Sequence, residues 1–449
     1  MTRPRFPHPL TLLTGCVLAA ALLSWVLPAG RYDRREDPAT GRSVVVPGTY
    51  HAVEPSPVGP FDAVVDIPKG MADAADIIFL VFLIGGAFTV VDRTGALRTG
   101  VTWLSRRLRD REVWVIPVVS LFFATGGVLE NMQEEIIALV PVLLILTGRL
   151  GFRPLVAISM SAGAAFVGSA FSPINPFQVG IAQKLAELPL LSGGLYRLLF
   201  LLLALAVWIG STMRYAARTR RAPDAPDALE DGPEDPADRR HGLILGLVVA
   251  TFGVLVYGLL GLGWGFDELS ALFFIMGVVA GLMGGLRIGG TAEAYVAGFR
   301  SMAYAALLIG FARAIFVVLD QGQIVDTIVR GVFSPIEDLP LGLSALGMMA
   351  AHTAVHVPVP SVSGHAVLTM PVLVPLSDLL GLSRQVTVLA YQYGAGLCDL
   401  LTPTNGALLA ILAAGGVGYE EWLSFAVPRY LVLLGLGMVA VLVAIGVGL

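Results

Sequence analysis

A short polar sequence occurs twice, at equivalent places in two long apolar segments of this chain. The stretch Ser172–Asn175 (SPIN) returns 230 positions later as Thr402–Asn405 (TPTN). The same interval separates two further prolines, Pro141 and Pro371, with no gap in register. Proline interrupts the hydrogen-bond ladder of a helix. Each copy therefore predicts an apolar helix that is broken by a polar turn. Two internal repeats with broken helices are typical of secondary transporters, which build their binding sites from the breaks.

The composition is that of a polytopic membrane protein. Hydrophobic residues make up 56% of the chain and charged residues 14%, whereas soluble domains carry about 25% charged residues. Many apolar runs reach the roughly 20 residues that a helix needs to cross a bilayer. The two cysteines, Cys16 and Cys398, lie far apart in apolar segments and form no disulfide or metal-binding pattern.

We expect an all-α fold with two inverted repeats, each containing a re-entrant hairpin and a broken helix. The first repeat is placed at residues 1–213, with its hairpin near 113–149 and its broken helix near 155–188. The inverted second repeat is placed at 263–449, with its hairpin near 342–380 and its broken helix near 386–417. Between the repeats we expect a disordered cytoplasmic linker at 214–241 and a connecting span at 242–262, which turns the second repeat over.

Arginine placement gives the orientation. Arginines cluster before the first span, after the second span and in the central linker. Cytoplasmic loops carry an excess of positive charge. The sequence therefore predicts a multi-pass protein of the cytoplasmic (inner) membrane, with its N-terminus in the cytoplasm.

The tip of the first hairpin is unusually acidic. Glu130, Glu134 and Glu135 fall within six residues in the middle of an apolar stretch. A charged side chain at the centre of a membrane helix costs at least about 2.5–3.5 kcal/mol. We therefore expect the tip to hold a cation, which could be Na⁺, H⁺ or an amino group of the substrate. The alternative is a short loop outside the membrane with solvated carboxylates.

The broken helices supply short polar groups: Ser172, Asn175, Thr402, Thr404 and Asn405. Backbone carbonyls freed at such a break can ligate Na⁺, and freed N–H groups can hold a carboxylate. A plain proline kink is the alternative.

Five further residues are weighed individually. Asp399 lies one turn before the second break and is predicted to bind a proton or another coupling cation. Arg313, in an apolar run, is a candidate partner for a buried carboxylate or a substrate carboxylate, and a structural ion pair fits equally well. His365, at the second tip, is the preferred site histidine, whereas His352 and His356 are expected to pack or lie at an interface.

Several functions are disfavoured. Neither of the two lysines follows a phosphate-binding Gly-rich loop, so ATP hydrolysis is not expected. The chain shows no nucleophile elbow or other catalytic constellation, and the two histidines four residues apart lack the glutamate of a zinc protease. We therefore expect no enzyme activity, no bound metal or organic cofactor and no nucleic-acid partner.

At these residues the chain resembles the YfcC family, a basic amino acid antiporter-like group close to the anaerobic C4-dicarboxylate carriers within the ion-transporter superfamily. The matching stretches are Met132–Glu135, Gly168–Phe177 and Asp399–Gly406. The resemblance extends over nearly the whole chain. It implies an elevator-type carrier in which a transport domain moves against a scaffold domain, and it makes a homodimer the expected assembly. Carried over residue by residue, it implies a site of Asn131, Glu134, Glu135, Ser361, Ser363 and the two Pro-Asn breaks.

The leading hypothesis is a secondary active transporter of a small polar metabolite in the lipid bilayer. The acidic tip favours an amino acid such as arginine or ornithine, moved by antiport or by coupling to Na⁺ or H⁺, and Glu130, Glu135 and Asp399 are the coupling-ion candidates. The resemblance to dicarboxylate carriers favours a C4-dicarboxylate instead. A Na⁺/H⁺ antiporter or an ion channel is the alternative from another class.

Overall fold

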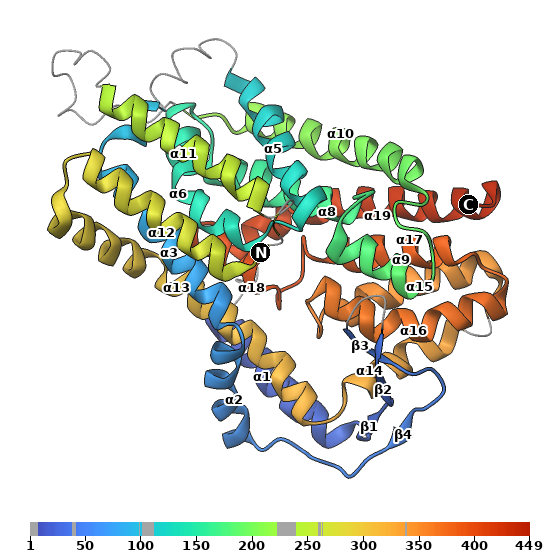
Figure 1. Ribbon diagram of the computed structural model, residues 1–449. Coiled ribbons are helices and arrows are strands. Elements are labelled where there is room, and N and C mark those ends of the chain that lie inside the picture. The colour runs from blue at the N-terminus through green and yellow to red at the C-terminus, as the bar shows by residue number, and fades with distance from the viewer. Residues whose placement is uncertain are drawn as a thin grey trace, which may run out of the picture.

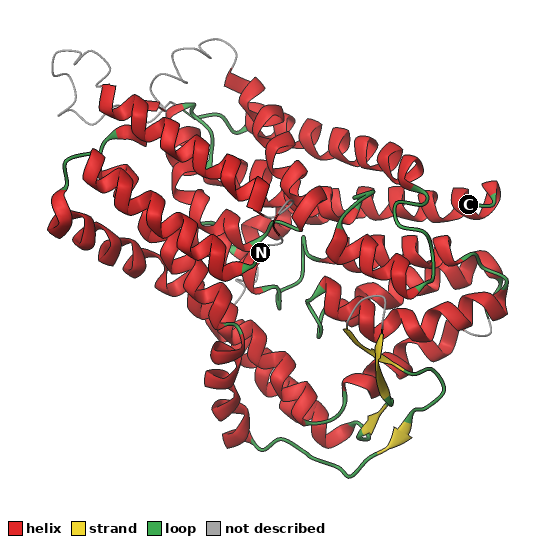
Figure 2. Ribbon diagram, viewed as in Figure 1, coloured by secondary structure: helices red, strands yellow, loops and turns green. Residues whose placement is uncertain are grey.

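The computed structural model describes residues 8–37, 42–97, 99–100, 112–221, 239–258, 262, 264–336 and 339–449, and the side chains of Asp37, Arg42, Glu130, Ala138 and Val256 lie outside this description. Most of the expected linker, residues 222–238, also lies outside it. The described chain is mostly helical (Figure 2). Within it, eight helices are long and apolar enough to cross a membrane, which agrees with a multi-pass membrane protein.

The first half of the chain contains a series of helices, and two of the gaps between them matter for the site. They are α1 (Pro9–Val26), α2 (Pro60–Asp73), α3 (Ala75–Arg93), η1 (Glu112–Trp114), α5 (Val115–Glu130), α6 (Glu134–Arg149), α7 (Pro154–Ile158), η2 (Ser159–Gly163), α8 (Ala164–Ala170), η3 (Pro176–Gly180), α9 (Ile181–Leu185) and α10 (Gly194–Arg218). Residues 131–133 separate α5 from α6, and residues 171–175 separate α8 from η3. Both gaps fall at the polar sequences singled out above.

The second half follows a similar order. Its helices are α11 (Arg239–Tyr257), α12 (Phe266–Met283), α13 (Arg287–Gln321), α14 (Val325–Phe333), η5 (Ser334–Ile336), α15 (Leu341–His356), α16 (Val362–Leu380), α17 (Arg384–Cys398), α18 (Gly406–Ala414) and α19 (Tyr419–Val447). Here the gaps are at 357–361 and 399–405. They again coincide with a predicted hairpin tip and a predicted helix break.

The helices gather into two groups, which Figure 1 shows side by side. In one group, α13 packs against α1, α2, α3 and α12. In the other, α5 packs on α8, α15 on α17, and α10 and α17 on α19. Helix α18 contacts both groups, because it packs against α13 of the first group and α19 of the second. It also contacts α6.

The expectation of an all-α fold needs one correction. The loop after α1 forms two short antiparallel ladders, which pair β1 (Gly30–Arg31) with β4 (His51–Ala52) and β2 (Arg34–Asp37) with β3 (Arg42–Val45). Strands of two to four residues are too short to leave a period-two pattern in the sequence. Asp326 of α14 fixes this loop, because its buried carboxylate accepts from Tyr32 N at 2.9 Å and from Arg34 Nη2 at 2.9 Å.

Glycine sets the close approach of α5 to α8 and of α15 to α17. A Cβ atom on Gly127 would lie 2.0 Å from the carbonyl oxygen of Ala165, and a Cβ on Gly394 would lie 2.3 Å from the carbonyl oxygen of Met349. Neither backbone atom can move without displacing its helix. Small residues at helix crossings are how membrane helices bring their backbones together, so these two positions hold each hairpin against its broken helix.

We predict that Gly127→Ala and Gly394→Ala each lower the free energy of unfolding by about 1–3 kcal/mol, the usual cost of overpacking. Thermal unfolding of the purified protein in detergent measures the loss. Gly435→Ala is the control, because a Cβ at this position of α19 would meet nothing within 4 Å. It should keep or slightly raise the unfolding temperature, since alanine is the better helix former. Equal behaviour of the three variants would contradict the packing described here.

Candidate functional site

Each helix break ends in an asparagine that caps the helix after it. The side-chain oxygen of Asn175 accepts from the backbone N–H groups of Phe177 at 2.9 Å and Gln178 at 3.0 Å. The side-chain oxygen of Asn405 accepts from the backbone N–H of Leu408 at 2.9 Å. The first turn of a helix has N–H groups without partners, and asparagine is among the preferred caps. The repeated Pro-x-Asn sequence is therefore a repeated capping device.

The amide nitrogen of each asparagine reaches back to the residue six positions before it. Asn175 Nδ2 lies 3.4 Å from Ser169 Oγ and donates to the carbonyl of Gly127 at 2.9 Å. Asn405 Nδ2 donates to Asp399 Oδ1 at 2.9 Å. The two breaks thus share one design, but only the second contains a carboxylate.

Asp399 is the centre of a buried polar network. Its side chain is 3% exposed and accepts hydrogen bonds from three parts of the fold. Asn405 is the first donor, Gln133 Nε2 donates at 3.1 Å, and His356 Nε2 lies 2.8 Å from Oδ1. Gln133 Oε1 also accepts from Asn405 Nδ2 at 3.1 Å. The tip of the first hairpin is therefore hydrogen-bonded to the second break, across 266 positions of sequence.

The two glutamates after Gln133 are half-buried and begin α6. Glu135 Oε2 accepts from the backbone N–H of Gln133 at 3.2 Å. Glu134 lies within electrostatic range of Glu135, Asp399 and Asp76. No basic side chain in the described part of the chain forms an ion pair with Glu134 or Glu135. The side chain of Glu130 lies outside the described residues.

The first break is closed by neutral hydrogen bonds. Ser172 Oγ donates to the carbonyl of Val128 at 2.8 Å and accepts from the backbone N–H of Asn175 at 2.8 Å. Asn131, which has a left-handed backbone (φ 57°), accepts from Ser169 Oγ at 2.5 Å. These contacts hold the first tip on the first break, as the grouping of Asn131 with Ser172 and Asn175 predicts.

The second hairpin tip presents two serines and hides its histidine. Ser361 and Ser363 are half-buried, and Ser361 Oγ caps α16 by accepting from Gly364 N at 3.3 Å. His365 is fully buried, and its Nε2 lies 2.8 Å from Nδ1 of His352. His352 and His356 are also fully buried. His356 therefore does more than pack, because it contacts the Asp399 carboxylate.

Both threonines and two further carbonyls of the second break have protein partners. Thr402 Oγ1 shares a hydrogen bond with Cys398 Sγ at 2.8 Å, and Thr404 Oγ1 donates to the carbonyl of Val357. Trp422 Nε1 donates to the carbonyl of Leu400 at 2.7 Å, and the Tyr419 hydroxyl donates to that of Leu401. Helix α19 thus satisfies two carbonyls that a broken helix would otherwise leave for an ion.

Arg313 and a second arginine occupy different environments. Arg313 forms an ion pair with Asp73 of α2, and the two side chains are 38% and 47% exposed. Arg197 of α10 is fully buried, and no motif in the sequence pointed to it. Its Nε donates to Gln392 Oε1 at 2.9 Å and its Nη2 to Gln385 Oε1 at 3.1 Å. Gln392 in turn donates to the carbonyl of Ser172 at 2.7 Å, so Arg197 supports the first break from behind.

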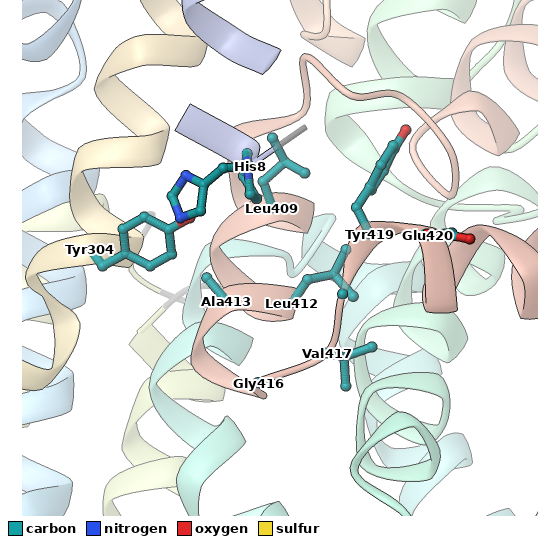
Figure 3. Close-up of a pocket in the computed structure, with 11 residues that line it drawn as sticks. His8, Tyr304, Leu409, Leu412, Ala413, Gly416, Val417, Tyr419 and Glu420 are labelled. Carbon is teal, nitrogen blue, oxygen red and sulfur yellow. The ribbon is translucent and has the colours of Figure 1, made fainter. Parts of the chain in front are cut away.

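A hollow of about 490 Å³ lies elsewhere, between His8, Tyr304, the end of α18 and the start of α19 (Figure 3). Its walls include the apolar side chains of Leu409, Leu412 and Val417. None of the residues predicted to bind substrate or ion lines it. The polar groups of the candidate site converge instead at the hairpin tips and helix breaks.

Comparison with known proteins shows the family to which the chain belongs. The family profile described as C4-dicarboxylate anaerobic carrier (DcuC) matches residues 6–446. The chain belongs to this family. A curated relative, the "Putative basic amino acid antiporter YfcC" of Escherichia coli (strain K12), is 31% identical over 465 residues, which cover 93% of this chain and 92% of the relative. The resemblance to YfcC-like and dicarboxylate carriers is thus confirmed, and the protein is a membrane transporter.

Two further similarities are more distant. An uncharacterised protein of Haemophilus influenzae (strain ATCC 51907 / DSM 11121 / KW20 / Rd) is 28% identical over 494 residues, which cover 98% of this chain and 97% of the relative. Among solved structures, the YdaH transporter of Alcanivorax borkumensis is similar with a TM-score of 0.46 and 18% identity, over 98% of this chain and 99% of that one.

The two capping asparagines should differ in their contribution to stability. We predict that Asn405→Ala lowers the free energy of unfolding by about 2–4 kcal/mol, because it removes a helix cap and takes a donor from a buried carboxylate. Asn175→Ala should cost about 1–2 kcal/mol, because its partners are neutral. Thermal or denaturant unfolding in detergent compares the two variants. Equal losses would mean that the Asp399 network adds nothing to stability.

Proposed function

We propose that this transporter is a secondary active carrier of a cationic amino acid, such as arginine or ornithine. The observation that supports it is the group of three carboxylates, Glu134, Glu135 and Asp399, none of which forms an ion pair with a lysine or arginine in the described residues. Buried or half-buried carboxylates without a counter-ion are costly. A substrate that brings its own positive charge lowers that cost when it binds.

The chemistry of the two tips suits an amino acid. A guanidinium or ammonium group can bind to Glu134 and Glu135, since hydrogen bonds between ionised groups are the strong ones. The first turn of α16 has backbone N–H groups that its own helix cannot satisfy, and such a helix end attracts a carboxylate. Ser361 and Ser363 stand at that end. We assign the substrate contacts to the predicted set: Asn131, Glu134, Glu135, Ser172, Asn175, Ser361, Ser363, His365, Thr402, Thr404 and Asn405.

We further propose an inverted-repeat, elevator-type carrier. Matched caps at the same interval in both halves support the repeat. The packing supports it too, because α9 of the first half packs on α16 and α18 of the second half packs on α6. Each segment after a break thus contacts the hairpin of the other half.

In this proposal α1, α2, α3 and α13 belong to the scaffold. The N-terminus is cytoplasmic, the protein lies in the inner membrane, and it assembles as a homodimer.

The driving ion is Na⁺ or H⁺, and Glu130, Glu135 and Asp399 are its proposed ligands. Moving one charge across 100 mV is worth about 2.3 kcal/mol, which is enough for useful accumulation. Exchange of two metabolites is the other route, and the name of the Escherichia coli relative, a putative antiporter, favours it.

A C4-dicarboxylate is the second candidate substrate, and the family description supports it. Such a substrate adds negative charge beside Glu134 and Glu135. It therefore requires bound Na⁺ or protons to neutralise the tip. Dependence of dicarboxylate binding on Na⁺ would favour this candidate.

We predict that Glu135→Gln lowers affinity for arginine about 10- to 100-fold, because a hydrogen bond to a charged group contributes about 1.5–3 kcal/mol. Uptake of labelled arginine into proteoliposomes measures the effect, with succinate as the competing substrate. Glu421→Gln, an exposed glutamate at the start of α19, is the control and should transport as wild type does.

Counterflow separates the carrier from a channel, because only a carrier exchanges labelled for unlabelled substrate. Uptake of succinate without uptake of arginine would overturn the amino acid assignment. Conductance without counterflow would overturn the carrier assignment itself.

A further inference from the structure

Three fully buried histidines stand beside the site, and each has one ring nitrogen without a hydrogen-bond partner in the structure. The unpartnered atoms are His352 Nε2, His356 Nδ1 and His365 Nδ1. Buried polar atoms are almost always hydrogen-bonded. Three such exceptions in one cluster make these ring nitrogens candidates for binding a proton.

His356 is placed to carry a positive charge. When its Nε2–H donates to Asp399 Oδ1 at 2.8 Å, Nδ1 holds an unused electron pair. A proton on Nδ1 converts a neutral ring beside a carboxylate into a buried ion pair with no net charge. His356 is also the last residue of α15, and the negative end of a helix dipole stabilises an imidazolium.

His352 and His365 form a second pair of titratable groups, next to His356 and Asp399. The rings of His356 and His365 have centroids 5.6 Å apart, and those of His352 and His365 are 5.0 Å apart. The hydrogen bond between His352 Nδ1 and His365 Nε2 requires one nitrogen to donate and the other to accept. One proton therefore lies in this hydrogen bond, and when the donor ring takes up an additional proton on its other nitrogen, the proton in the bond can pass to the acceptor ring.

Among the described residues, the helices packed around His356 bring it no charge partner other than Asp399. From α17 and its end, Asp399 faces it directly, while Cys398 is hydrogen-bonded to Thr402. Tyr391 of α17 donates its hydroxyl to the carbonyl of Val362. On α14, Asp326 is paired with Arg34, and Arg330 stacks on Tyr50. On α19, Arg429 stacks on Phe425. From the described part of the first tip, the Glu134 carboxylate lies within electrostatic range of Asp399.

We propose that His356 with Asp399 is the proton-binding site that couples transport to a proton gradient, and that the His365–His352 pair is the next station for that proton. The proton binds the electron pair of Nδ1 and leaves it again, and no other bond changes. A cationic substrate near Glu134 and the proton on His356 both neutralise the same group of carboxylates. They therefore compete, and substrate and proton move in opposite directions. This inference rests on the proposed cationic substrate for its coupling, but not for its proton binding.

Proton binding is tested first, without substrate. The purified full-length protein and His356→Gln are titrated between pH 8 and pH 5, the range in which histidine titrates. Wild type should take up about one more proton than the variant. Glutamine keeps an amide donor for Asp399, and detergent size exclusion with thermal unfolding verifies that the variant is folded. A histidine that only packs stays neutral, so coincident titration curves would overturn the proposal.

Coupling is tested in proteoliposomes with an acidic interior. Wild-type arginine uptake should rise about tenfold over that without a gradient. In His356→Gln the rise should be absent, so that arginine uptake is the same with and without the gradient. His51→Gln, which changes an exposed histidine near the strands, is the control and should behave as wild type does. Persistent stimulation in His356→Gln would overturn the proposal.

A measurement on wild type alone guards against a misfolded variant. Binding of arginine in weak buffer should release about one proton per protein, read with a pH-sensitive dye. Binding without release would overturn the coupling role of His356, whereas absence of arginine binding and counterflow would count against the substrate assignment. The titration result stands in either case.

Discussion

The buried carboxylate of Asp399 is the constraint on which this structure depends. An ionised carboxyl group inside a membrane protein is tolerated only when donors surround it. Its three donors come from the tip of the first hairpin, the end of α15 and the cap of α18. Satisfying one charge thereby fixes three segments that are far apart in the sequence. The same network brings Glu134 and Glu135 next to the second break.

The two halves share a backbone device and differ in charge. Asparagine caps both segments after the breaks, and its amide reaches back six residues in each half. At the 230-residue interval between the halves, Ser169 corresponds to Asp399 and Gly126 corresponds to His356. The first break is therefore held by neutral bonds and the second contains the titratable groups. The two breaks therefore share a backbone arrangement and differ in whether they can bind a proton or a cation.

The sequence predicted the interruptions better than the contacts. Proline and asparagine act locally, so the positions of both breaks and both tips could be predicted from the spacing alone. The partners of Asp399 could not, because Gln133 lies 266 residues away and periodicity carries no information on pairing between helices. His356 was expected to pack or to lie at an interface, because the sequence around it lacks the glutamate of a zinc-protease motif. The small ladders around Arg34, and helices α2 and α14, also escaped prediction, since they are short or only partly apolar.

The central claim is that the first hairpin tip and the second break form one network, and a double-mutant cycle tests it most directly. Gln133→Ala, Asn405→Ala and the double variant are compared by unfolding in detergent, with Gln133→Ala and Asn175→Ala as the control cycle. Residues in one hydrogen-bond network couple by about 0.5–3 kcal/mol, whereas independent sites add within about 0.5 kcal/mol. We predict coupling of about 1 kcal/mol or more between Gln133 and Asn405, and additivity in the control cycle. Additivity in both cycles would contradict the account.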